Sequence, residues 1–246
     1  MAEVQTLARG LRILELLAEF EDGLSSTELA ELIDVDKSSM SRLMNTLVNY
    51  RFAERDEQTR RYYLGTHVQE LGRRAGQHAS LRDIAQAYLQ ELATITRENA
   101  HVAVYSAPHA LTIADIPSTE PLRVVSEVGR RVPVHCSAIG KCLLAFAEIP
   151  MPMSYTRYTD KTIIDAGQLA EQLETIRYQG YAIDDEELTL GVRGLAVPIR
   201  NREGRIIATM GLSGPGVRLT YDNIPDLLTL LTEAANKVSA ELGFQL

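Results

Sequence analysis

Cysteine and long apolar runs are both scarce in this chain of 246 residues. Only Cys136 and Cys142 occur, too few for the disulfide framework of a small secreted domain. No apolar run reaches the ~18 residues that mark a membrane-spanning helix, and residues 1–5 do not begin a secretory signal peptide. We therefore expect a cytoplasmic protein that does not associate with membranes.

An excess of positive charge is also absent. The 25 Lys and Arg residues are outnumbered by 33 Asp and Glu residues, which gives a net charge of −8 at pH 7. A protein this acidic does not coat nucleic acid indiscriminately, because its overall field repels phosphate. Any nucleic-acid footprint must be small and local. The stretch 36–62 is the candidate, since it contains six basic residues and four acidic residues.

Motifs of catalysis and metal binding are missing as well. There is no glycine-rich phosphate loop and no nucleophile elbow, the five histidines form no i, i+4 pair, and the cysteine spacing fits no common zinc site. The acidic run 184–187 could bind a metal or act as an acid–base pair, but we favour a solvated loop with one inward carboxylate. We expect no metal, no cofactor and no enzymatic activity.

The length predicts one or two domains, and residues 1–65 form the first. Apolar residues at helical spacing predict a helix from about 7 to 21–23. Ser25-Ser26-Thr27-Glu28 is a capping box that begins a short second helix. Asp36 then caps a third helix that runs to about Asn49.

The third helix has two chemically different faces. An apolar stripe at i, i+3, i+4 and i+7 must face the core: Met40, Leu43, Met44 and Leu47. The opposite side carries hydrogen-bond donors and no carboxylate, and its contact candidates are Lys37, Ser38, Ser39, Ser41, Arg42 and Asn45. These donors suit the major groove of DNA, where Arg reads guanine and Asn reads adenine. On composition alone, a polar surface helix is an equal alternative.

The segment after this helix predicts a two-stranded hairpin, with strands at 52–55 and 60–64 around a turn at 56–59. A hairpin directly after a helix-turn-helix is a wing, and Arg60 and Arg61 at its tip would contact phosphates. Taken alone, the arginine pair could simply be solvated on an edge strand. Joined to the preceding helices, it favours a winged DNA-binding domain.

The remaining chain divides into a connecting helix, 66–79, and an α+β domain, 80–246. The connecting helix has little apolar surface of its own. In the second domain the spacing predicts strands at 101–107, 111–116, 195–200 and 205–212, paired antiparallel, and helices from 80, at 137–147, at 167–179 and from 224 to 242.

Several motifs stand in a fixed order along the chain. The first domain has the capping-box helix, Lys37-Ser38-Ser39-Met40-Ser41-Arg42-Leu43-Met44 and Tyr63-Leu64-Gly65. The second has Val128-Gly129-Arg130-Arg131-Val132-Pro133, Ala138-Ile139-Gly140-Lys141, Gly180-Tyr181-Ala182-Ile183-Asp184-Asp185-Glu186-Glu187, Gly191-Val192-Arg193, Ala196-Val197-Pro198 and Leu212-Ser213-Gly214-Pro215. From about Leu7 to Gly243 the sequence resembles the isocitrate-lyase-regulator (IclR) family of bacterial transcription factors.

The resemblance implies a winged helix-turn-helix, a linker helix and a C-terminal effector-binding domain of GAF-like topology. It also implies a homodimer or tetramer that binds a pseudo-palindromic operator in double-stranded DNA, controls a catabolic operon and responds to a small organic or aromatic acid. Matched residue by residue, the effector pocket is lined by Ser137, Ala138, Asp184 and Ser213. Backbone amides at a helix N-terminus attract a carboxylate, which agrees with this placement.

Three positions depart from the family pattern. Gly194 stands where the family commonly has cysteine, and Gly211 where it often has serine. Both changes remove volume and a polar group from the expected pocket wall, so we expect a ligand with more apolar bulk than a two- or three-carbon keto acid. Arg51 replaces the usual glycine after the recognition helix. The left-handed conformation costs Arg about 1 kcal/mol more than Gly, so we expect that turn to move onto Asn49.

Two alternatives stay open beside a ligand-responsive regulator. One is an enzyme of small organic acids that uses Cys136 or Asp184 in the α+β domain. The other is a redox-sensing regulator, because a thiol near a helix N-terminus, such as Cys136, can have a lowered pKa. For both cysteines we favour buried structural thiols.

Overall fold

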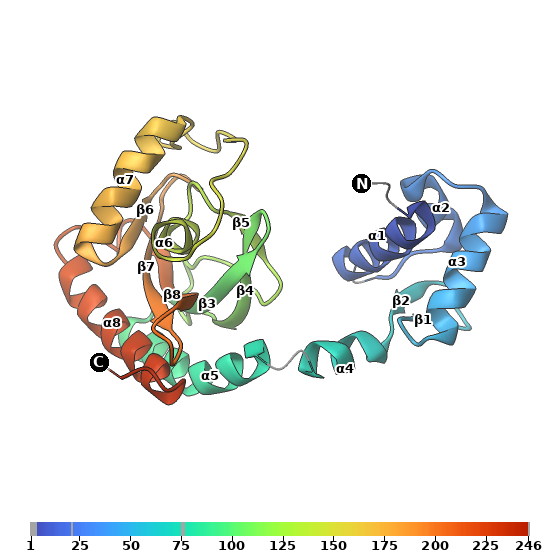
Figure 1. Ribbon diagram of the computed structural model, residues 1–246, viewed down its shortest axis with the longest axis horizontal. Helices are drawn as coiled ribbons and strands as arrows, with labels where there is room; N and C mark the ends of the chain where they lie inside the picture. The colour runs from blue at the N-terminus through green and yellow to red at the C-terminus, as the bar shows by residue number, and fades with distance from the viewer. Residues whose placement is uncertain (1–3, 21, 75–76, 246) are drawn as a thin grey trace. The chain divides into compact units, whose positions relative to one another are not determined.

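A computed structural model describes residues 4–20, 22–74 and 77–245. It divides into two compact units, residues 1–79 and 80–246, and each is described by itself (Figure 1). The predicted linker helix 66–79 corresponds to one helix and the start of the next, while residues 75 and 76 lie outside the described part. The expected boundary at residue 65 stays a prediction.

The first unit is a helix-turn-helix followed by a two-stranded wing. Its elements are α1 (Gln5–Glu19), α2 (Ser26–Ile33), α3 (Lys37–Asn49), β1 (Ala53–Arg55), β2 (Tyr62–Leu64) and α4 (Thr66–Arg74). The predicted capping box is present, because the Ser25 hydroxyl accepts the Glu28 amide at 3.3 Å and the Glu28 carboxylate accepts the Ser25 amide at 2.7 Å. α3 has the limits that its cap predicts, whereas α1 ends earlier than expected, at Glu19.

The end of α3 differs from the sequence-based expectation. Arg51 itself takes the left-handed conformation, with φ of 60°, and Asn49 remains helical. The Arg51 amide donates to the Val48 carbonyl at 2.9 Å and the Phe52 amide donates to the Leu47 carbonyl at 2.8 Å. These are the two bonds of a Schellman motif, which ties down the last carbonyls of the helix. The expected shift onto Asn49 is therefore wrong, because the closing bonds require the bend at residue 51.

The second unit is built on a six-stranded antiparallel sheet in the order β5-β4-β3-β8-β7-β6. Its elements are α5 (Gln77–Thr96), β3 (Asn99–Ser106), β4 (His109–Ile116), β5 (Arg131–Pro133), α6 (Ala138–Phe146), α7 (Ala166–Gln179), β6 (Ala182–Asp185), β7 (Val192–Arg200), β8 (Ile206–Pro215) and α8 (Ile224–Glu241). The α+β class with antiparallel pairing is confirmed. Strands β5 and β6 were not predicted.

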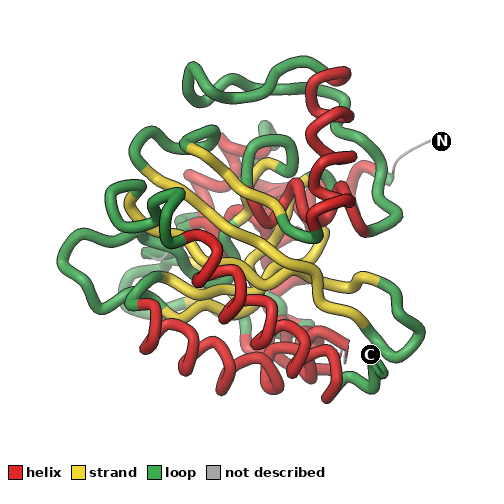
Figure 2. The backbone as a smooth tube through the Cα atoms, turned by 90° about the vertical axis from the view of Figure 1, so that its left-hand side faces the viewer, coloured by secondary structure: helices red, strands yellow, loops and turns green. Residues whose placement is uncertain are grey.

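Helices cover both faces of this sheet (Figures 1 and 2). Alternation along β7 places Leu195, Val197 and Ile199 in the core shared with α5 and α8, and Ala196 in the core shared with α6 and α7. Ser137 is the N-cap of α6, and its hydroxyl accepts the Gly140 amide at 3.2 Å. A side chain at Gly140 would place its Cβ 2.4 Å from the Cα of Val134, so glycine is required for this close approach.

Candidate functional site

The polar face of α3 is turned outward, and its apolar stripe is turned inward. Met40 and Met44 are fully buried, with Leu43 and Leu47 packed beside them. Five of the six contact candidates on this helix are exposed, namely Lys37, Ser38, Ser41, Arg42 and Asn45, whereas Ser39 is partly buried. Within its own unit, this helix therefore presents the donor-rich surface that the sequence predicts.

Asp36 engages two of these candidates. Its carboxylate accepts the hydroxyl of Ser38 at 2.5 Å and that of Ser39 at 2.7 Å, as well as the backbone amides of both residues. These bonds, led by the two hydroxyls, hold the pKa of Asp36 well below its usual range. Asp36 is thus the N-cap of α3, and Ser38 and Ser39 lie in the first turn that it caps. Farther along the helix, the exposed Arg42 guanidinium donates to the Ser39 hydroxyl at 3.3 Å.

The two arginines of the wing have different surroundings. Arg60 is exposed, with φ of 56°. The Arg61 guanidinium donates to the backbone carbonyls of Asp22 and Gly23, and lies 3.1 Å from the Glu28 carboxylate. The Arg61 guanidinium thus links the wing to the turn between α1 and α2, whereas the side chain of Arg60 is exposed to solvent.

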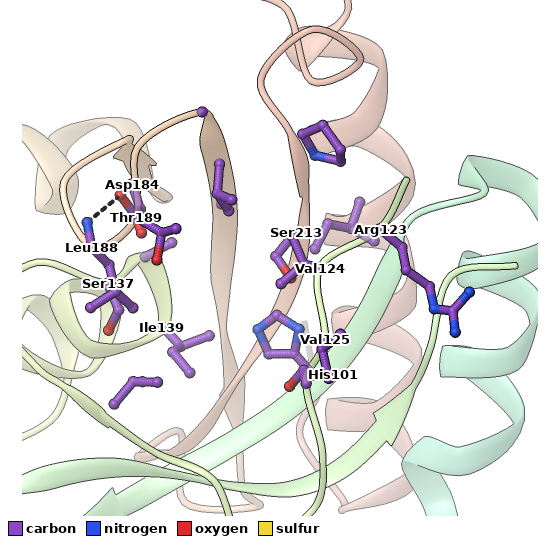
Figure 3. A pocket seen from close by; sticks show the side chains of 18 of the residues that line it. His101, Arg123, Val124, Val125, Ser137, Ile139, Asp184, Leu188, Thr189 and Ser213 are labelled. Carbon is purple, nitrogen blue, oxygen red and sulfur yellow. Dashed lines mark hydrogen bonds between the residues drawn. The ribbon is translucent and has the colours of Figure 1, made fainter. Parts of the chain in front are cut away.

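A pocket of about 520 Å³ lies in the second unit, between the N-terminus of α6 and the sheet (Figure 3). Its volume lies within the ~300–1,000 Å³ of small-molecule sites. Strand residues His101, Gly194 and Ser213 form part of its wall, and the loops 122–126 and 188–192 contribute mainly apolar side chains. Of the predicted effector residues, five line it: Ser137, Ala138, Asp184, Gly194 and Ser213.

Hydrogen-bond donors come from the α6 side of the pocket. Ala138 and Ile139 occupy the first turn of α6, where backbone amides have no partner within the helix, and both residues line the pocket. The Ser137 hydroxyl is used locally, since it donates to the Pro133 carbonyl at 2.7 Å. The pocket therefore offers amide donors and the positive end of the helix dipole at this point, which suits an anionic group.

Asp184 lies on the same side and belongs to a buried charged group. Its carboxylate accepts the amides of Glu187 at 2.8 Å and Leu188 at 3.3 Å. Burial, with the charge of Glu187, raises the pKa of Asp184 to about 7. The fully buried ammonium of Lys141, in α6, forms an ion pair with Glu187. This arrangement explains the acidic run better than a solvated loop does, since both Asp184 and Glu187 are about 95% buried, each with 5% exposed.

The sheet side of the pocket carries a different polar group, which sequence reasoning missed. His101 is 7% exposed and lines the pocket, and its Nδ1 lies 3.1 Å from Oδ1 of the fully buried Asn99. Ser213 Oγ donates to the same Asn99 oxygen at 3.1 Å. The available signal was the strand alternation, which places residues 99 and 101 on one face of β3, but the strand was predicted to start only at 101.

The two glycines of the predicted wall differ. Gly211 does not line the pocket, because the His101 imidazole from the neighbouring strand lies over it; a Cβ there would be 2.8 Å from His101 Nε2. The expectation that Gly211 leaves the wall without volume or a polar group is therefore wrong. Gly194 does line the pocket, and a Cβ there would meet Ala138 at an ordinary 3.4 Å.

Both cysteines are buried and free. Burial, with the nearby charges of Asp184 and Glu187, raises the pKa of Cys136 to about 12, and burial also raises the pKa of Cys142. The suggested lowering of the Cys136 pKa is therefore wrong, because desolvation opposes the thiolate more than the helix end favours it. The favoured description, buried structural thiols, agrees with this environment.

Within residues 4–20, 22–74 and 77–245, no group of three or more His, Cys, Asp and Glu side chains is arranged to hold a metal ion. The helices described there include none long and apolar enough to cross a membrane.

Comparison with known proteins identifies the family. Residues 6–57 match the IclR helix-turn-helix domain, and residues 74–240 match the bacterial transcriptional regulator IclR C-terminal domain. The regulator KdgR of Escherichia coli is 32% identical over 98% of this chain and 94% of its own length, and the repressor IclR of the same organism is 30% identical over 98% and 91%. The chain belongs to the IclR family of bacterial transcriptional regulators, not to a family of enzymes.

Solved structures agree with this assignment. The IclR of Thermotoga maritima is 27% identical, with a TM-score of 0.76 over 98% of this chain and 100% of that one. An IclR homologue from Microbacterium hydrocarbonoxydans, solved in complex with 4-hydroxybenzoate, is 25% identical, with a TM-score of 0.84 over 96% and 98%. The protein is thus a DNA-binding transcriptional regulator with a ligand-binding C-terminal domain.

Proposed function

We propose that this regulator reads a pseudo-palindromic operator as a homodimer or tetramer and releases or engages it in response to a small organic acid bound in the 520 Å³ pocket. A two-fold symmetric protein pairs naturally with a two-fold symmetric site, because each α3 then enters one major groove. The genes it controls, on this proposal, form a catabolic operon whose substrate or product is the effector.

The observation that carries the DNA-binding part is the exposed face of α3. Arg42 and Asn45 lie one turn apart on that face, and no carboxylate separates them. An Arg can donate two bonds to guanine and an Asn can bond both ways with adenine, so these two residues supply sequence readout. Lys37 and Arg60 supply the contacts to phosphate, and the Asp36 cap with Ser38 and Ser39 fixes the start of the helix.

The effector part is supported by the asymmetry of the pocket. Amide donors and a helix N-terminus lie at one side, and the remaining wall is mostly apolar, which suits an acid with an apolar body. The Microbacterium homologue binds 4-hydroxybenzoate, an acid of that description. The redox alternative has no specific observation in its favour, since Cys136 is a poor thiolate in this setting. The enzyme alternative is set aside because both domains match families of transcriptional regulators.

The test is an Arg42→Ala variant, assayed on an operator selected from random duplexes by the wild-type protein. We expect a loss of about 1–3 kcal/mol in binding and relaxed specificity at one base pair per half-site, with little change in salt dependence. Arg12→Ala is the matched control, because Arg12 is an exposed arginine on α1, paired with Glu15 at 3.0 Å. Unchanged binding of Arg42→Ala to the native operator would contradict the assignment of α3.

A further inference from the structure

The amide of Asn99 has a fixed orientation in the sheet. Its Nδ2 donates to the Asp115 carboxylate at 3.0 Å and to the Ile116 carbonyl at 3.2 Å, and neither of those oxygens can donate in return. The Asn99 side-chain oxygen must therefore point the other way and act as an acceptor. Because Asn99 is fully buried, no water competes for this arrangement.

This orientation dictates the hydrogens on two pocket residues. Asn99 Oδ1 accepts from His101 Nδ1 and from Ser213 Oγ, both at 3.1 Å. The single hydroxyl hydrogen of Ser213 is thereby used, so its oxygen faces the pocket as an acceptor. The Nδ1 of His101 must carry the ring hydrogen, which leaves Nε2 without one in the neutral ring.

The ring of His101 is neutral near pH 7. Burial is the main cause that lowers the pKa of His101 to about 4; the negative charge of Asp115 on β4 opposes this shift, and the positive charge of Arg130 adds to it. The other polar groups that hydrogen-bond within this cluster, Asn99 and Ser213, carry no charge. His101 Nε2 and Ser213 Oγ are therefore both acceptors where they meet the pocket.

His101 Nε2 has no hydrogen-bond partner among the residues that the structure describes. The β3–β8 register sets His101 opposite Gly211, and the imidazole extends over that glycine to within reach of Ile139 of α6. Figure 3 shows His101 and Ser213 at one wall, with Ser137 and Asp184 at the other. Because His101 lines the pocket, Nε2 is an acceptor that a ligand donor can engage there.

The two walls are complementary to different ends of one molecule. A carboxylate fits the α6 amides better than it fits His101 Nε2 and Ser213 Oγ, where it would meet two lone pairs. The Arg130 guanidinium, which would attract a carboxylate, already donates to the Val125 carbonyl. A cationic donor is disfavoured near His101 by the charge of Arg130, which also lines the pocket. We propose that the pocket selects a hydroxy-carboxylate, whose carboxylate binds the first amides of α6 and whose hydroxyl donates to His101 Nε2. This rests on the proposed function, because it names the class of the effector.

Calorimetry with two matched pairs of acids tests this selection: 4-hydroxybenzoate against 4-methoxybenzoate, and 6-hydroxyhexanoate against hexanoate. In at least one pair the hydroxyl member should bind on the order of tenfold more tightly, because only it donates a hydrogen bond to His101 Nε2. The methoxy compound keeps the ring and the oxygen, with a methyl group in place of the donated hydrogen, and hexanoate lacks the hydroxyl altogether without adding volume. Equal affinity within both pairs, or no binding by any of the four acids, would overturn the inference.

A His101→Leu variant should lose that preference and bind both members of a pair equally. His109→Leu is the matched control, since His109 lies on β4 and does not line the pocket; it should keep the preference. Preference retained in His101→Leu would contradict the role of His101. Should His101→Leu unfold, nitrogen NMR of the wild-type imidazole gives the same decision, because the inference requires hydrogen on Nδ1 and none on Nε2 at pH 7.

The proposed function and this inference fail differently. Loss of operator readout in Arg42→Ala, together with no hydroxyl preference, would leave the regulator proposal standing and remove the ligand class. The opposite result is a hydroxyl preference that depends on His101 together with normal operator binding by Arg42→Ala. That result would support the ligand class and contradict the assignment of α3.

Discussion

Asp184 is held at a balance between its two protonation states. Desolvation and the charge of Glu187 favour the neutral acid, whereas the amides of Glu187 and Leu188 and the ammonium of Lys141 favour the carboxylate. Desolvation and the charge of Glu187 have the larger effect, so the pKa of Asp184 rises to about 7. Motif matching could place Asp184 in the pocket, but this balance depends on Lys141 and Glu187, which meet only after α6 packs against the sheet.

This balance makes stability depend on pH. Because the pKa of Asp184 is about 7 in the folded protein and ordinarily 3.8, the folded state binds the extra proton between those values, and stability falls as pH rises through that window. Asp184→Asn keeps an oxygen for both amides but does not titrate. Urea unfolding at several pH values should therefore show the variant gaining stability relative to wild type from pH 5 to pH 8. Parallel curves for the two proteins would contradict the raised pKa.

His101 shows what residue-by-residue reading cannot supply. The sequence contains five scattered histidines, and nothing in their spacing assigns a role to His101. Asn99 is the first residue of β3, but the strand was predicted to begin two residues later, at 101. The pocket wall arises from the β3–β8 register, which sets His101 opposite Gly211 and Asn99 opposite Ser213. Pairing between segments more than 100 residues apart is not encoded in local spacing, so the sequence identified Ser213 without its partner.

At the scale of elements, capping chemistry was the most reliable guide. Asp36 and the Ser25–Glu28 pair predicted where α3 and α2 begin, because these side chains bond amides within their own first turn. Strands β5 and β6 escaped prediction since each has three or four residues, too few to show a period of two. Their pairing comes from the neighbouring strands, β4 and β7.

The closing turn of α3 stores strain that a single substitution should release. Arg51 has φ of 60°, which glycine adopts without a Cβ penalty, so Arg51→Gly should raise the free energy of unfolding by about 1 kcal/mol. Asp34→Gly is the matched control at the end of α2, with φ of 56°; it should gain less, because aspartate tolerates this conformation. Thermal or urea unfolding of both variants measures the difference. No gain from Arg51→Gly would show that its side chain contributes as much as its backbone costs.

For the whole molecule, the sequence assigned DNA reading and ligand binding to separate stretches of chain, and the structure places them in separate compact units. The sequence predicted this division because each unit has its own apolar core, whose residues recur at helix or strand spacing within that unit. The presence of a DNA-binding site and a ligand-binding site is not sufficient for regulation. A ligand shifts operator affinity only if it binds one arrangement of the protein more tightly than another.

That requirement gives a reciprocal prediction. If a bound acid changes operator affinity by some factor, the operator must change the affinity for the acid by the same factor, on the order of 5- to 150-fold for a coupling of about 1–3 kcal/mol. We expect calorimetry with 4-hydroxybenzoate, with and without saturating operator, to give the factor found by operator titration with and without the acid. In Arg42→Ala, at an operator concentration where no complex forms, the DNA should leave the affinity for the acid unchanged. If acid and operator bind together and neither changes the affinity for the other, the pocket does not control operator binding by α3.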